Sequence, residues 1–229
     1  MAQSEHRSSN PIIPPVILNL MIANGMMFFF QTFFGQQTYA MLSKLFALWP
    51  LGAAEWAQYH SSVGIFMPWQ VLTYGFLHGN LTHLLVNMLV LWMFGREIEM
   101  RWGAKRFAVY FFVCVIGAGI IQLLVASFSL TTGGLPYPTV GASGGTCGLL
   151  LAYGMLFPYR RIMLLIPPIP MEARYLVIVV GAIELVSGLS GLTPGIANFA
   201  HLGGMLFGLL LILYWRGKLP LKPKTRMYW

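Results

Sequence analysis

Long apolar runs separated by short polar segments dominate the chain. Six runs have the character of helices buried in a lipid bilayer, at about residues 16–34, 81–95, 106–127, 143–157, 175–190 and 198–215. The first, third and sixth have the length expected of a full span, and the other three are short or interrupted. The pattern predicts an all-α fold: a polytopic membrane protein built as a bundle of six transmembrane helices.

These runs predict a single membrane domain over residues 15–216, with a short N-terminus at 1–14 and a basic tail at 217–229. No soluble stretch long enough for a second folded unit separates the runs, and no internal repeat of fixed period is present. The first run is about 19 residues long and ends in Phe33 and Phe34 rather than in a small-residue cleavage site. We therefore expect it to be retained as a helix rather than removed as a signal peptide.

Composition supports a membrane location. Hydrophobic residues make up 57% of the chain and charged residues only 9%, whereas soluble domains carry about 25% charged residues. If six spans leave both termini in the cytoplasm, every lysine and arginine except Lys44 falls on the cytoplasmic side, and the loops 128–142 and 191–197 have no charge. This positive-inside pattern accounts for the net charge of +8 without nucleic acid as a partner.

The same pattern predicts a multi-pass protein with both ends of the chain inside, and the short ends favour a bacterial cytoplasmic membrane as its location. The basic tail after Arg216 is expected to lie against anionic lipids of the inner leaflet.

The acidic residues exclude several kinds of membrane enzyme. The chain has no aspartate, so an aspartyl protease and a Ser-His-Asp triad are both impossible. No His-Glu-x-x-His helix is present, so we expect neither a metal site nor a cofactor. What remains for hydrolytic chemistry is a serine, a histidine and neutral hydrogen-bonding groups.

The candidate pair is Ser143, within Gly141–Gly145, and His201, which opens a second glycine-containing run. In a six-helix topology the fourth and sixth helices are parallel, and both residues lie near the outer ends. Glycines spaced i, i+4 let helices approach closely in lipid, and they occur on both helices: Gly144 with Gly148, and Gly204 with Gly208.

Two alternative roles for Ser143 are weaker. The sequence Gly-x-Ser-x-Gly also occurs at the nucleophile elbow of soluble lipases, but that turn requires a preceding strand, and residues 131–138 have a loop composition. A serine at a helix start is also a common cap.

The fourth helix is about 22 Å long and is too short for a hydrocarbon core of about 30 Å. We expect its serine end to lie below the outer surface, beside a water-filled cavity into which the loop 128–142 dips. His83 and Asn87 share a face of the second helix at a similar depth. With the backbone N–H of Ser143 they are candidates to stabilise an oxyanion, although a packed histidine and a helix-bridging asparagine are the structural alternatives.

These motifs together resemble the rhomboid family of intramembrane serine proteases, over essentially all of residues 15–216. The matching positions are Gly141, Ser143 and Gly144; His201, Gly204 and Gly208; His78, His83 and Asn87; and Gly95 and Glu99. The resemblance implies Ser143 as nucleophile, His201 as general base, and His83, Asn87 and the Ser143 amide as the oxyanion hole. It also implies single-pass membrane proteins as substrates, cut near the outer face of the bilayer. One departure is Gln70 after Trp69, where many relatives carry arginine, and this puts the packing of the first outer loop in doubt.

Two questions remain open at this stage. A catalytically inactive relative that binds client proteins is the alternative function, whereas a transporter would be expected to show inverted repeats, which are absent. Glu184 lies inside the fifth apolar run, where an ionisable side chain is costly and usually functional. One hypothesis is that it tethers the fifth helix to the second and gates substrate access; the other is that it orients His201.

Overall fold

The computed structural model describes residues 12–163, 168–191, 197–223 and 225–228, and these form a helical membrane bundle. Five described helices are long and apolar enough to cross a membrane. They are α1 (Pro15–Phe33), α5 (Leu81–Trp102), α6 (Ala104–Thr131), α8 (Ala173–Ser190) and α9 (Asn198–Trp215). The sixth, α7 (Ser143–Leu156), has 14 residues and is shorter.

The predicted fold class is therefore confirmed, with each apolar run in a helix. Two boundaries differ from the prediction, because α5 continues to Trp102 and α6 extends to Thr131. The charged residues at the end of α5 ended the apolar run without ending the helix. The proposed N-terminal segment 1–14 and the loop 191–197 lie largely outside the described residues.

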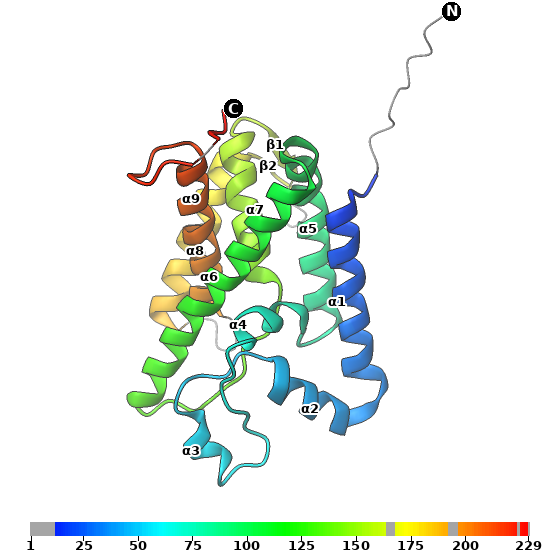
Figure 1. Cartoon of the computed structure of the whole chain (residues 1–229), viewed down its shortest axis with the longest axis vertical. Helices are drawn as coiled ribbons and strands as arrows, with labels where there is room; N and C mark the ends of the chain where they lie inside the picture. Colours follow the sequence, from blue (N-terminus) through cyan, green and yellow to red (C-terminus); the bar gives the residue numbers. More distant parts are fainter. Residues whose placement is uncertain (1–11, 164–167, 192–196, 224, 229) are drawn as a thin grey trace, which may run out of the picture.

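Short elements complete the chain. Between α1 and α5 lie α2 (Gly35–Phe46), α3 (Ala53–Ala57), α4 (Gln70–Thr73) and the 3₁₀ turn η1 (Tyr74–Phe76). An antiparallel hairpin of β1 (Arg161–Met163) and β2 (Pro170–Glu172) precedes α8. Figure 1 shows α2 and α3 at one end of the bundle, opposite the end at which α1 begins and α9 finishes.

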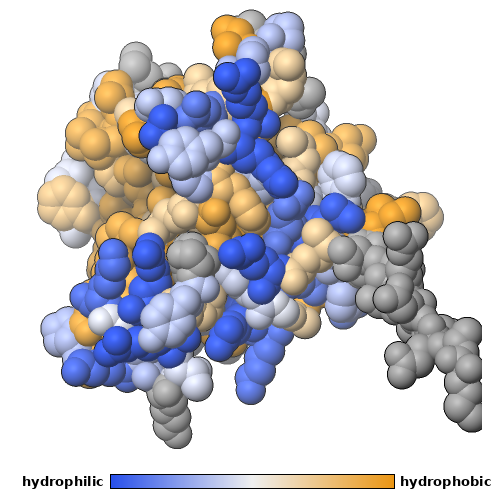
Figure 2. Space-filling view, turned by 90° about the horizontal axis from the view of Figure 1, so that it is seen from above, coloured by the Kyte–Doolittle hydropathy of each residue, from blue (hydrophilic) through white to orange (hydrophobic). Residues whose placement is uncertain are grey.

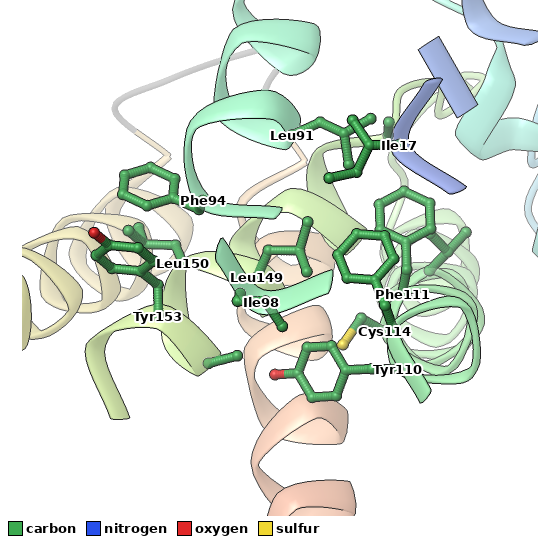
Figure 3. Packing of buried hydrophobic residues seen from close by; sticks show 14 of the residues in the cluster. Ile17, Leu91, Phe94, Ile98, Tyr110, Phe111, Cys114, Leu149, Leu150 and Tyr153 are labelled. Atoms are coloured by element: carbon green, nitrogen blue, oxygen red, sulfur yellow. The ribbon is translucent and has the colours of Figure 1, made fainter. Parts of the chain in front are cut away.

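The α7 helix lies at the centre of the bundle, in contact with α5, α6, α8 and α9. Figure 3 shows its side chains Leu149, Leu150 and Tyr153 among residues of α1, α5 and α6. The hydroxyl of Tyr110 on α6 donates a hydrogen bond to the Gly148 carbonyl at 2.8 Å. Buried hydroxyls need such partners, so this bond sets α6 against α7 at one position.

Glu99 joins the start of α1 to α5. Its two carboxylate oxygens accept the backbone N–H groups of Val16 and Ile17, each at 3.0 Å. The first N–H groups of a helix have no partner within it and carry partial positive charge. A buried carboxylate at this position therefore caps α1 from a neighbouring helix, which explains an acidic residue in an apolar bundle.

Gln70 holds together the loop between α2 and α5. Its side-chain N–H₂ donates to the carbonyls of Lys44 and Ile65, and its oxygen accepts the backbone N–H of Trp49. The side chain is fully buried. The doubt raised by the missing arginine is thus answered for this chain, because the glutamine satisfies several backbone groups of the loop by itself.

The end of the bundle at which α9 finishes is polar. Figure 2, seen onto that end, shows hydrophilic side chains spread over it with hydrophobic residues between and around them. Arg160 pairs there with Glu97 at 2.6 Å. Part of the basic tail folds back onto α9, since the backbone N–H of Met227 donates to the Trp215 carbonyl at 2.9 Å.

Candidate active site

Ser143 is the first residue of α7, and the loop before it enters the protein. Backbone hydrogen bonds join Thr139 to Leu48 in both directions, and the Gly141 N–H donates to the Tyr74 carbonyl at 2.9 Å. These bonds satisfy backbone groups that would otherwise be buried unpaired. The loop therefore dips toward the bundle interior, as the short length of the fourth apolar run predicted.

Gly141 is required by two features of this loop. Its φ of +125° lies in a region that residues with a Cβ rarely adopt. A Cβ here would also lie 2.7 Å from the ring of His83. The glycine therefore lets the backbone pass between His83 and Ser143, so that the imidazole and the hydroxyl lie on either side of one small space.

Ser143 and His201 are in direct contact. The Nε2 atom of His201 lies 2.8 Å from the Oγ of Ser143. His201 stands in the first turn of α9, and its backbone N–H donates to the Ala197 carbonyl. The two parallel helices thus bring together two residues that are 58 positions apart in the chain.

Glycines allow this approach. A Cβ at Gly204 would overlap the backbone carbonyl of Gly144, and one at Gly144 would overlap the Ala118 side chain. The predicted close contact between α7 and α9 is present at this pair. One turn further along, a Cβ at Gly148 would meet both Cys114 of α6 and the Gly204 carbonyl of α9, and a Cβ at Gly208 would meet Tyr110 and Cys114 of α6. The α6 helix therefore packs against the same glycines of α7 and α9.

The predicted oxyanion residues lie beside the serine. Asn80 caps α5 by accepting the His83 N–H at 2.8 Å. The His83 Nδ1 accepts a long 3.4 Å bond from the Gly79 N–H, and a neutral ring with Nδ1 as acceptor carries its proton on Nε2. This tautomer, assigned from the hydrogen bonds, directs an N–H donor toward Gly141 and the serine.

Asn87 is oriented by two bonds. Its side-chain N–H₂ donates to the His83 carbonyl at 2.9 Å, and its oxygen shares the Thr146 hydroxyl, at 3.4 Å, with the Ser143 carbonyl, which lies closer at 3.1 Å. An amide nitrogen has two hydrogens, so a second donor remains. Thr146 was not identified from the sequence. Its position three residues after Ser143, on the same helix face, was the only available signal.

Glu184 lies on the far side of His201 from the serine. One of its carboxylate oxygens is 2.9 Å from the Nδ1 of His201. Of the two hypotheses for this residue, the placement agrees with the one that links it to His201. The residue that Glu184 contacts at ion-pair distance is on α9 rather than on α5.

His78 lies in the turn before α5, where it is buried and contacts α1 rather than the serine. Its backbone N–H and carbonyl bond to the side chain of Gln31 on α1, and its ring meets the ring of His83 edge-on at 5.0 Å. Burial and the neighbouring His83 ring lower the pKa of His78 to about 4. Its ring is therefore neutral at physiological pH.

The arrangement has the parts that nucleophilic catalysis requires. A hydroxyl and an imidazole nitrogen are within hydrogen-bond distance, which lets the ring take up the hydroxyl proton. The His83 ring and the Ser143 hydroxyl both lie near the Cβ position of Gly141, and Asn87 contacts Thr146 on the helix that Ser143 begins, so both side chains are candidates to hold an oxyanion. Among the described residues, histidine, cysteine and acidic side chains form no group of three that would hold a metal ion.

Sequence comparison finds several known proteins that are similar to this chain. The sequence profile of the Rhomboid domain matches residues 66–218. The chain is 26% identical over 230 residues to Rhomboid protein 1, mitochondrial, of Saccharomyces cerevisiae, covering 91% of this chain and 65% of that protein. It is 33% identical over 140 residues to the rhomboid protease GluP of Bacillus subtilis, covering 61% of this chain and 24% of that protein.

A third relative is RHOMBOID-like protein 4 of Arabidopsis thaliana, 34% identical over 143 residues, with 62% of this chain and 33% of that protein covered. The chain thus spans between about a quarter and two thirds of the length of these three relatives.

Proposed function

The chain belongs to the rhomboid family, and we propose that it is an intramembrane serine endopeptidase that cuts single-pass membrane proteins. The observation that carries this proposal is the 2.8 Å contact between Ser143 Oγ and His201 Nε2. An inactive relative would lack the serine or the histidine, and this chain has both residues in contact. The names of two similar proteins, the rhomboid protease of Bacillus subtilis and a rhomboid-like protease of Toxoplasma gondii, support the same activity.

In the proposed mechanism, His201 acts as general base. Its Nε2 takes the proton of the Ser143 hydroxyl while Oγ attacks the scissile carbonyl carbon, and the carbonyl π electrons move to the oxygen. The resulting imidazolium then protonates the leaving amine as the C–N bond breaks. Water attacks the acyl-enzyme by the same route, and Ser143 is released.

The oxyanion would be held by three donors: the side chains of His83 and Asn87 and the N–H of Ser143. Such donors act best when their orientation is set before the reaction. His83 is held by the backbone of Gly79, and Asn87 is held between the His83 carbonyl and Thr146. The network that orients these groups is therefore built largely into α5 and α7.

The short length of α7 supports a site below the membrane surface. Its 14 residues span about 21 Å, so a helix anchored at the opposite face ends inside a hydrocarbon core of about 30 Å. A substrate helix would have to unwind to present an extended peptide bond there. We therefore propose substrates whose transmembrane segment is weakly helical near the same face.

We further propose a bacterial cytoplasmic membrane as the location, with both ends of the chain inside. The distribution of lysine and arginine supports the orientation, and the relative from Bacillus subtilis supports the setting. Tyr59 comes two residues after the end of α3 and Tyr228 lies in the tail after α9, and both are 83% exposed. Figure 1 shows α3 and the C-terminus at opposite ends of the bundle. A membrane-impermeant maleimide should label Tyr59→Cys in intact cells and Tyr228→Cys only after permeabilisation. The reverse pattern would contradict the orientation.

The activity is tested with a single-pass reporter, tagged at both ends, that carries glycine and alanine near the outer end of its span. Co-expression with the wild-type chain should give two fragments, and Ser143→Ala should give none while remaining folded. Ser190→Ala is a matched control, because this exposed α8 serine bonds only its own helix. EDTA should not change the cleavage.

Two outcomes would contradict the proposal. Continued cleavage by Ser143→Ala would exclude this serine as the nucleophile. Co-purification of an uncut reporter with wild-type protein, without labelling by a serine-directed fluorophosphonate, would instead indicate the client-binding function of an inactive relative.

A further inference from the structure

We propose that Glu184 is a positioning residue for His201, so that the site is a Ser143–His201–Glu184 triad rather than a dyad. This inference rests on the proposed protease function, and it assigns a role to a carboxylate of α8. The three side chains come from α7, α9 and α8 and lie in one line of contacts. Ser143 touches one ring nitrogen of His201 at 2.8 Å, and Glu184 touches the other at 2.9 Å.

The geometry limits what Glu184 does. The side chains of His201 and Glu184 are only 14% and 16% exposed. The Nδ1 of His201 and the second carboxylate oxygen of Glu184 have no well-aligned hydrogen-bond partner in the described part of the chain. Glu184 is therefore the group available to the buried Nδ1, and a small ring or carboxylate rotation would complete the hydrogen bond.

Burial makes the pairing necessary. An isolated carboxylate inside a membrane protein is costly, and such residues are found paired or functional. Every lysine and arginine of the nearby helices α5, α7, α8 and α9 lies toward their opposite ends. The titratable side chains near the pair are His83 of α5 and Cys147 of α7. Of the groups around Glu184, the imidazole of His201 is the one at ion-pair distance from the carboxylate.

The pairing acts at two stages of the reaction. Before attack, Nδ1–H directed at Glu184 leaves Nε2 unprotonated, which is the form that can accept the serine proton. After that transfer, His201 carries protons on both nitrogens and a positive charge, which the carboxylate stabilises across the 2.9 Å contact. The Nδ1 proton stays on the ring throughout, and only the serine proton moves on to the leaving amine.

The test compares wild type with Glu184→Gln, in detergent, by the rate of fluorophosphonate labelling between pH 5 and pH 9. A charged hydrogen bond replaced by a neutral one should slow labelling by about 10- to 100-fold. Without the negative charge the imidazolium that forms in the reaction loses its partner, so the acid limb of the rate profile should change in Glu184→Gln. Ser190→Ala, on the same helix, should keep the wild-type rate and profile.

A second measurement needs no variant. In the wild-type protein at neutral pH, ¹⁵N NMR of histidine-labelled protein should show His201 with its proton on Nδ1, and a proton on Nε2 would overturn the proposal. An unchanged rate and pH profile in folded Glu184→Gln would also overturn it. Labelling that is lost in Ser143→Ala but unchanged in Glu184→Gln would contradict the role of Glu184 and leave the protease function intact. Absence of Ser143-dependent labelling in wild type would instead contradict the protease function itself.

Discussion

Gly204 of α9, three residues after His201, lies directly against the backbone carbonyl of Gly144 of α7, the residue that follows Ser143. The two helices cannot meet this closely if residue 204 has a side chain, because its Cβ would overlap the Gly144 carbonyl. The separation of the glycines therefore sets the distance between the nucleophile and its base.

Gly204→Ala should push α9 away from α7, because the added methyl group would overlap the Gly144 carbonyl. Overpacking of this kind costs about 1–3 kcal/mol. We expect a lower melting temperature in detergent and a large loss of reporter cleavage. Gly25→Ala on α1 is the matched control, since nothing lies within 4 Å of its Cβ position, and it should preserve both properties.

Asn87→Ala should slow cleavage by about 10²- to 10³-fold, the usual effect of removing one oxyanion donor. The control is Asn24→Ala on α1. This buried asparagine makes the same kind of bond to a carbonyl four residues earlier, at 2.8 Å, far from the site. Both variants should lose similar stability, and only Asn87→Ala should lose rate. Equal rates in the two variants would remove Asn87 from the oxyanion hole.

Glu99→Gln should destabilise the protein without touching the chemistry. A carboxamide can accept only one of the two backbone N–H groups of Val16 and Ile17 and places its own N–H₂ against the other. A lost hydrogen bond to a charged group costs about 1.5–3 kcal/mol. Glu97→Gln, at a half-exposed ion pair with Arg160, should cost much less. Thermal melts of both variants decide the matter, and equal melting temperatures would contradict the capping role of Glu99.

The lowered pKa of His78 predicts that the folded protein loses stability in acid. Because its pKa falls to about 4 in the folded protein, the unfolded chain binds a proton below pH about 6.5 that the folded chain does not. Stability is thus fully present above that pH and is lost as pH falls toward 4, by at most about 3 kcal/mol. The melting temperature of His78→Gln should fall less between pH 7 and pH 5 than that of wild type. An identical fall in both would exclude His78 as the cause.

Much of this arrangement could be predicted from the sequence, because the membrane restricts the possible folds. Apolar runs of span length must be helices, and a serine and a histidine among glycines could meet only if those helices were parallel. The pairing of Ser143 with His201 followed from that. The depth of Glu184 could be predicted too.

The partners of several residues could not be predicted, since helices in lipid are apolar on all sides. The sequence of α8 does not distinguish the face toward lipid from the face toward protein, so the direction of Glu184 toward His201 required the structure. For the same reason the sequence did not show that α6 also packs on these glycines, with Tyr110 and Cys114 lying against Gly208. Gln70 could not be evaluated at all, because its partners are backbone groups of an irregular loop.

The central claim is that Ser143 is a nucleophile activated by His201, and reaction with a fluorophosphonate in detergent tests it most directly. The wild-type chain should form a covalent adduct at Ser143, identified by mass spectrometry of the labelled peptide. Labelling should disappear in Ser143→Ala and in His201→Ala and persist in Ser190→Ala. A folded wild-type protein that does not react, or an adduct that survives in Ser143→Ala, would contradict the account.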